Sequence, residues 1–156
     1  MRETTRIDDL LVRLAGIPAR VASAVTGLSE SLLHTPSVAG GWSTAEIFAH
    51  MRASDDIMAP RVSMILVRDQ PPLAAYDERR WAEVAGYTQA GFQTSLQAFT
   101  LRRAELVSML HSIASEEWRR VGEHEARGPV SLLDVITTLV EHEEEHCAQL
   151  EAAQAG

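Results

Sequence analysis

Lysine is absent from the sequence, and cysteine occurs once, as Cys147. All 14 basic residues are therefore arginines, and 22 acidic residues outnumber them, which leaves a formal net charge of −8. The exclusive use of arginine is typical of a codon bias toward GC-rich DNA. An acidic chain without a basic cluster repels phosphate backbones, so we expect no nucleic-acid partner. A single thiol allows no internal disulfide and suits a reducing cytoplasm.

Long apolar runs are also missing. The first residues, MRETTRIDDLL, lack the apolar core of a secretion signal, and the best apolar run, VSLLDVITTLV, is short and interrupted by Asp134. We therefore expect no membrane span and a cytoplasmic location. The chain has 156 residues, 46% of them hydrophobic, which predicts a single domain over residues 1–156 with its own core.

Helical periodicity dominates the pattern of apolar residues and predicts four long helices, at about residues 5–28, 43–68, 91–113 and 131–153. Pro18 is expected to kink or split the first helix. Ser43 with Glu46, and Ser131 with Asp134, predict the starts of the second and fourth helices. The intervening segments are expected to be loops without strands, with one helical turn near residue 81. The predicted fold class is all-α, a four-helix bundle with a long crossing connection between helices 2 and 3.

The segment EHEEEH, residues 141–146, literally matches H-E-x-x-H, the pattern of a zinc peptidase helix. A buried stripe at 3–4 spacing runs through Leu132, Val135 and Leu139, and it continues onto His142 and His146. Both histidines should face the interior, where residues four apart can share one metal ion. The three glutamates between them, residues 143–145, are expected to point sideways or outward.

A metal site needs a third ligand. No histidine follows His146 and no strand is predicted, so a peptidase is disfavoured. On the second helix, His50 shares an inward face with Ile47, Ser54 and Ile57, and it is the best upstream candidate. The alternative is that all three are core histidines, satisfied by carboxylates or water.

At this point the sequence resembles a known family. GWSTAEIFAHMRASDDIMAPRVSMIL is similar to the second helix of the DinB-like, YfiT-type four-helix-bundle metalloproteins. Their W-S-x-x-E-x-x-x-H signature is matched by Trp42, Ser43, Glu46 and His50, and their H-x-x-x-H-x-x-Q by His142, His146 and Gln149. PPLAAYDERRWAE, FTLRRAELVSML and WRRVGEH follow the family's order, so the resemblance covers about residues 6–152.

The resemblance implies a divalent metal, zinc or nickel, held by His50, His142 and His146. The H-E-x-x-H match is then incidental, and Glu143 is not implied as a base. Family members commonly have Asp at that position, so the role of Glu143 stays open.

Characterised relatives in the wider family transfer low-molecular-weight thiols such as mycothiol or bacillithiol, or isomerise maleylpyruvate. The leading hypothesis is therefore a metal-dependent thiol S-transferase acting on a small-molecule substrate. The alternatives are a metal-dependent hydrolase and a non-catalytic metal-binding protein. Arg61 and His124, with Arg52, are candidates for binding the thiol cofactor.

Two charged residues occupy apolar seams. Arg103 lies within the seam of the third helix and Asp55 within that of the second. A buried unpaired charge is costly, so we expect these two to pair. The alternative is that Arg103 lays its stem along the core and exposes its head. Cys147 is expected to be a buried, inert thiol.

The connection between the second and third helices contains Pro72, Leu73, Tyr76 and Trp81. Such apolar groups must cover something, either the cavity of their own chain, as a lid, or a neighbouring subunit. Family members commonly form dimers, so a homodimer through the first and third helices is expected.

Overall fold

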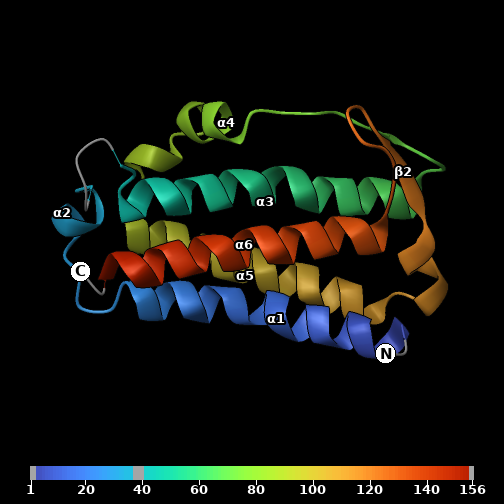
Figure 1. Cartoon of the computed structure of the whole chain (residues 1–156), viewed down its shortest axis with the longest axis horizontal. Coiled ribbons are helices and arrows are strands. Elements are labelled where there is room, and N and C mark those ends of the chain that lie inside the picture. Colours follow the sequence, from blue (N-terminus) through green and yellow to red (C-terminus); the bar gives the residue numbers. More distant parts are fainter. Residues whose placement is uncertain (1–2, 37–40, 155–156) are drawn as a thin grey trace.

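The computed structural model describes residues 3–36 and 41–154, and it is a four-helix bundle (Figure 1). The bundle helices are α1 (Glu3–Ala24), α3 (Thr44–Val67), α5 (Phe92–Ser112) and α6 (Leu132–Gln154). This confirms the predicted all-α bundle and its four helices, with ends that differ by a few residues. No helix of the described segments is long and apolar enough to cross a bilayer.

The first helix ends earlier than predicted and is not split. α1 continues through Pro18, because the fully buried side chains of Ile17 and Val21 hold both sides of the proline in the core. A separate short helix, α2 (Glu30–Leu33), follows it. The expected loop at 34–42 is described only in part, since residues 37–40 lie outside the described segments.

The first and last helices run parallel. Three arginines of α1, spaced seven residues apart, contact three residues of α6 with the same spacing: Arg6 contacts Thr137, Arg13 contacts Glu144, and Arg20 contacts Glu151. Each pair is 131 positions apart, so the two helices run in the same direction. α6 also packs on α3, and α1 packs on α5, whereas α3 and α5 touch only lightly. The bundle is therefore a square of helices with one loosely closed side.

The crossing connection follows from this topology. α3 and α5 run in the same direction, so the chain returns along the bundle before α5 begins (Figure 1). The return contains β1 (Pro72–Leu73), α4 (Glu78–Val84) and the 3₁₀ turn η1 (Tyr87–Gln89), which is more helix than the single turn predicted. It packs on α3 of its own chain.

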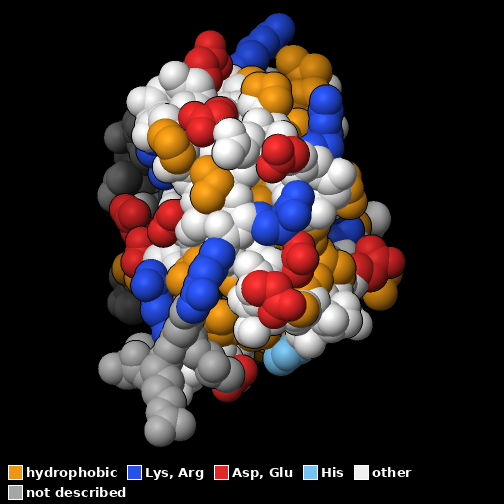
Figure 2. Space-filling model, turned by 90° about the vertical axis from the view of Figure 1, so that its right-hand side faces the viewer, with side chains coloured by type: hydrophobic (Ala, Val, Ile, Leu, Met, Phe, Trp, Pro, Cys, Tyr) orange, Lys and Arg blue, Asp and Glu red, His pale blue; other side chains and the backbone are white. Residues whose placement is uncertain are grey.

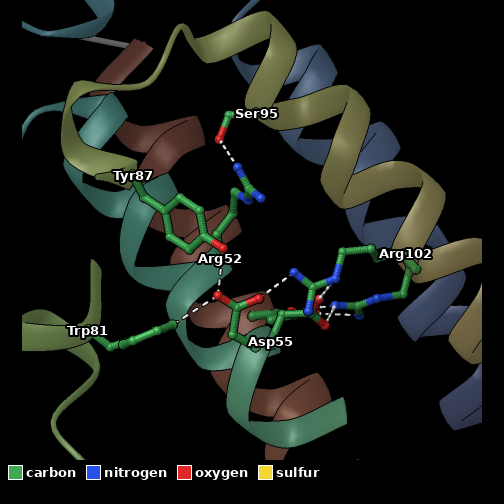
Figure 3. Close-up of polar contacts among 9 residues, drawn as sticks. Arg52, Asp55, Trp81, Tyr87, Ser95 and Arg102 are labelled. Atoms are coloured by element: carbon green, nitrogen blue, oxygen red, sulfur yellow. Dashed lines mark hydrogen bonds and ion pairs between the residues drawn. The ribbon is translucent and has the colours of Figure 1, made fainter. Parts of the chain in front are cut away.

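Asp56 of α3 fastens the connection. Its carboxylate accepts hydrogen bonds from Trp81 Nε1 at 2.9 Å and from the Tyr87 hydroxyl at 2.5 Å, and Arg102 of α5 binds it from the other side (Figure 3). The Arg52 guanidinium stacks 4.0 Å from the centre of the Tyr87 ring and donates to Ser95 Oγ. One carboxylate thus joins α3, α4, η1 and α5.

The expectation of no strands was wrong. After the 3₁₀ turn η2 (Ser115–Arg119), the strands β2 (Val121–His124) and β3 (Gly128–Ser131) form an antiparallel hairpin, and β1 pairs with β2 in parallel. These strands are too short to show an alternating pattern in the sequence. A Cβ on Gly122 would lie 2.8 Å from Leu73 Cδ1, so glycine lets the hairpin approach the connection closely.

The hairpin lies at one end of the bundle. On the face seen from that end, acidic and basic side chains are interspersed among apolar ones, and neither sign covers a broad area (Figure 2). The Arg120 guanidinium donates to the backbone oxygens of Ile65 and Arg68, at 2.7 Å each, and so ties the start of the hairpin to the end of α3.

A layer of buried charge divides the core. One apolar cluster includes Leu14, Val62 and Leu139, and the other includes Val21, Met51 and Phe99. Between the two lie buried charged residues from three helices: Asp55 of α3, Arg103 of α5 and Glu143 of α6, with exposed fractions of 2%, 1% and 0%.

Arg103 is the centre of this layer. Its Nη1 and Nη2 donate to the two oxygens of Glu143 at 2.6 Å each, and Nη2 also donates to Asp55 Oδ1 at 2.9 Å. The expected pair with Asp55 is confirmed, and the alternative of an exposed head is excluded. The stronger, two-point contact with Glu143 was not foreseen.

We predict that Arg103→Met destabilises the protein by about 3 kcal/mol, because two carboxylates then lose their counterion in the core. The further substitutions Glu143→Gln and Asp55→Asn in the same chain should recover a large part of that loss. Denaturant unfolding of the single and triple variants measures both effects. A triple variant no more stable than Arg103→Met would show that the three groups are not energetically coupled.

Candidate metal centre

The three inward histidines come together at one point of the bundle. His50 projects from α3, and His142 and His146 project from successive turns of α6. The Nε2 atoms of His50 and His142 are 3.0 Å apart, and those of His146 and His142 are 3.1 Å apart. All three rings therefore direct the same nitrogen at a common point.

These distances fit a shared metal ion. With metal–nitrogen bonds of about 2.0–2.1 Å, two ligand nitrogens lie about 2.9 Å apart at a right angle and about 3.4 Å apart at a tetrahedral angle. The observed separations fall within that interval. One donor atom from each of the three residues can be chosen so that all lie within 4.8 Å of one another, and no other such group occurs among the described residues.

The opposite ring nitrogens support the same assignment. His146 Nδ1 lies 3.0 Å from Gln149 Oε1, so Nδ1 carries the proton and Nε2 keeps its lone pair for a metal. The Nδ1 atoms of His50 and His142 are buried and have no hydrogen-bond partner among the described residues. If His50 and His142 adopt the same tautomer as His146, three lone pairs face one point, an arrangement that a bound cation would stabilise.

Burial keeps two of these rings, those of His142 and His50, neutral. It lowers the pKa of His142 to about 4, with further lowering by His146 and His50. Burial also lowers the pKa of His50, and His146 adds to that effect. A metal ion binds neutral imidazole, so the site is prepared for metal at neutral pH.

Glu143 was misplaced by the sequence interpretation, which expected it to point sideways or outward. It is fully buried and bound to Arg103, and burial raises its pKa to about 7 despite that contact. Glu143 therefore cannot act as the base of a peptidase. A second stripe of α6 contained the signal: 4–3–4–3 spacing through Ile136, Val140, Glu143, Cys147 and Leu150.

A cavity of about 270 Å³ adjoins the histidines. His142 lines one part of it, and Arg61 and His124, the two residues proposed from the sequence as cofactor contacts, line another. The crossing connection contributes Tyr76 and Glu78, and the hairpin contributes Arg127. The hairpin is thus the element that brings His124 to the site.

Other sequence candidates lie elsewhere. Arg52 is engaged with Tyr87 and Ser95 outside this cavity. His34 lies beside Glu30, and His111 lies in the last turn of α5. Cys147 is fully buried in an apolar cluster, as expected, and burial raises its pKa to about 11.

Comparisons with known proteins agree with this geometry. A family model described as the DinB superfamily matches residues 13–150. A Geobacillus kaustophilus protein named "Putative metal-dependent hydrolase" is 25% identical over 149 residues, which cover 95% of this chain and 84% of that protein. Bacillus subtilis "Putative metal-dependent hydrolase YfiT" is 24% identical over 138 residues, 88% of this chain and 78% of that protein.

A solved structure has the same fold. It is described as YfiT from Bacillus subtilis, "a probable metal-dependent hydrolase with an unusual four-helix bundle topology". Its TM-score is 0.87 at 22% identity, and the match covers 98% of this chain and 87% of that one. The parallel pairs α1–α6 and α3–α5 give the present bundle its departure from a simple up-and-down order.

We predict one divalent metal ion per chain. In untagged protein, His142→Ala together with His146→Ala should remove it, because two of three donors are lost, whereas the control variant His111→Ala should retain it. Elemental analysis measures the content. Metal should also dissociate as the pH falls, since protons compete for the imidazoles. Unchanged metal content in the double variant would rule out this site.

Proposed function

This chain belongs to the DinB superfamily, and we propose that it is a metal-dependent S-transferase that moves a low-molecular-weight thiol onto a small electrophile. The observation that carries the proposal is the three-nitrogen centre with a cavity against His142. Three neutral protein ligands are typical of a catalytic site with open positions. A bundle of this size has its own apolar core and does not require metal in order to fold.

A divalent cation such as zinc or nickel, bound by these histidines, would hold a thiol as its thiolate or lower the pKa of a water molecule. In the transfer, a sulfur–carbon bond forms and the bond from that carbon to its leaving group breaks. The thiol proton is taken up by a base beside the centre and then leaves with the leaving group. Mycothiol and bacillithiol are thiols of the class expected for this cofactor role.

The chain's own residues have distinct parts in this proposal. Gln149 Oε1 accepts a hydrogen bond from the Nδ1–H of His146 and so keeps Nε2 directed at the centre. Tyr76 covers the cavity from the crossing connection and limits the entry of water. Glu78 is the one carboxylate residue lining the cavity among the described residues, and its oxygens can accept the proton released there.

Hydrolysis is the second candidate. The names of the relatives favour it, and Glu78 could equally accept a proton from an attacking water. The position of Arg61 and Arg127 beside the same cavity favours thiol transfer, because bacillithiol, unlike mycothiol, carries carboxylates that two arginines could bind. A non-catalytic metal-binding protein would need no such cavity.

We predict that metal-loaded protein accelerates the reaction of small thiols with a fluorogenic bimane electrophile. His146→Ala should lower the rate by on the order of 100-fold, because the metal contributes several kcal/mol of charge stabilisation. Metal-free protein is the matched control. A panel of nitrophenyl esters and amides run in parallel tests hydrolysis. Metal-dependent turnover of the panel, without turnover of thiols, would assign a hydrolase, and no turnover of either would indicate a binding protein.

The homodimer expected from the sequence needs an interface other than the crossing connection, because that connection packs on α3 of its own chain. A groove of about 950 Å³ lies between α1 and α5. Arg103 is its only charged lining residue and is buried, while Leu101 on its rim is 69% exposed. We propose that a second copy packs here in a two-fold arrangement, each Leu101 entering the partner's groove.

We predict a homodimer in solution, with twice the monomer mass of 17.1 kDa by light scattering at micromolar concentration. Leu101→Arg should shift it toward monomer, because a charge would then enter an apolar groove. Val67→Arg is the control, since Val67 is 79% exposed and lies at the far end of α3. A wild-type monomer, or a dimer unaffected by Leu101→Arg, would reject this interface.

A further inference from the structure

Arg61 is a buried cation without a carboxylate partner. Arg61 is only 6% exposed, yet no carboxylate oxygen of the described residues lies within ion-pair distance of its guanidinium. Its guanidinium donates to the backbone oxygen of Ala74, lies 3.4 Å from Met58 Sδ, and stacks 4.8 Å from the centre of the Tyr76 ring. These contacts orient the guanidinium without neutralising it.

Such an arrangement is costly. Burial of an uncompensated charge normally requires a counterion, as the two carboxylates around Arg103 provide in the same bundle. Burial lowers the pKa of Arg61 and Arg127 lowers it further, whereas Tyr76 and Glu78 offset that effect only in part. The chain therefore maintains a cation at this position against its own stability, which indicates that an anion completes the site.

The surroundings of Arg61 are arranged for an anion. Arg127 and His124 line the same cavity, and His124 Nδ1 accepts the N–H of Ala126 at 3.1 Å. The neutral His124 ring therefore carries its proton on Nε2, which is free to donate. Glu78, the carboxylate of the cavity, shares a hydrogen bond with the Tyr76 hydroxyl and opposes an anion only from the connection side.

The extent of the cavity limits the size of the ligand. Arg61 of α3 and His142 of α6 both line it, and His142 is the one ligand histidine that does so. A small molecule that fills the cavity can therefore contact Arg61 with one end and His142 of the three-histidine centre with the other. The cavity volume of about 270 Å³ is at the lower limit for small-molecule pockets.

We propose that Arg61, assisted by Arg127 and His124, binds the carboxylate of a small substrate whose reacting group lies at the three-histidine centre. The substrate is thus a carboxylic acid with its reactive atom several bonds from the carboxyl carbon. The position of the reacting group depends on the proposed function, whereas the carboxylate site does not. Planar guanidinium can bind both oxygens of a carboxylate, which gives Arg61 its selectivity for this group over an amide.

The test compares a carboxylate with its amide. Titration calorimetry on metal-loaded protein would use 6-mercaptohexanoate and 6-mercaptohexanamide as probes. Wild type should bind the carboxylate at least about tenfold more tightly, and Arg61→Met should bind both equally. Arg68→Met removes the same charge two turns further along α3, at an exposed position, and should keep the preference.

Thermal unfolding separates binding from folding. Without ligand, Arg61→Met should melt at the same or a higher temperature than wild type, because an unpaired buried charge has been removed, and the carboxylate should no longer raise that temperature. Equal binding of acid and amide by wild type, or a preference that persists in Arg61→Met, would overturn the proposal.

The thioether 6-(methylthio)hexanoate keeps this test independent of thiol transfer. Its Arg61-dependent binding, together with an absence of thiol turnover, would preserve the carboxylate site and reject the transferase. Turnover of thiols without any Arg61-dependent preference for the carboxylate would support the transferase and reject the carboxylate site.

Discussion

The bundle depends on the ion cluster around Arg103. Its guanidinium reaches from α5 across the interior to Glu143 of α6 and also binds Asp55 of α3. Apolar side chains fill the interior on either side of this layer. Hydrophobic contact alone tolerates sliding of one helix along another, but a two-point ion pair in a buried position does not. The cluster therefore sets the register of α6 against α3, and His142 lies one residue before Glu143. The meeting of His50 with His142 follows from that register.

The topology explains the rest of the site. Because α3 and α5 are parallel, the chain must return along the bundle, and the returning segment lies over α3 (Figure 1). Its helix α4 lies beside His50. Asp56 fastens this segment, and β1 joins it to the hairpin through parallel pairing. Tyr76, Glu78, His124 and Arg127 therefore surround a cavity although they come from segments some 50 positions apart. A simple up-and-down bundle would have short loops at these places and no cover for the metal centre.

The two buried arginines are accommodated in opposite ways, although burying a charge costs free energy in both cases. Arg103 is surrounded by carboxylates of its own chain and has a structural role. Arg61 is held by a carbonyl oxygen and an aromatic ring and keeps its charge available in the cavity. Together with the neutral histidines at the other end, this gives the cavity two sites of different character. In the proposed function, the histidine site would hold the metal ion and the reacting group of the substrate, and the Arg61 site would hold the carboxylate.

The sequence by itself determined the four helices, their apolar faces and the candidate ligand set. All of these features depend on local periodicity and capping. The Ser43–Glu46 capping box, for example, forms as predicted. Such features can be predicted from the sequence wherever a helix buries a single stripe of residues. The sequence contains the second stripe of α6 that includes Glu143, but only the tertiary structure decided that this stripe is buried, because other helices cover α6 on two sides. It also decided the strands, since β2 and β3 are stabilised by pairing and by the close approach at Gly122 rather than by their own pattern. The cavity around Arg61 depends on contacts between distant segments, and no local pattern in the sequence records those distances.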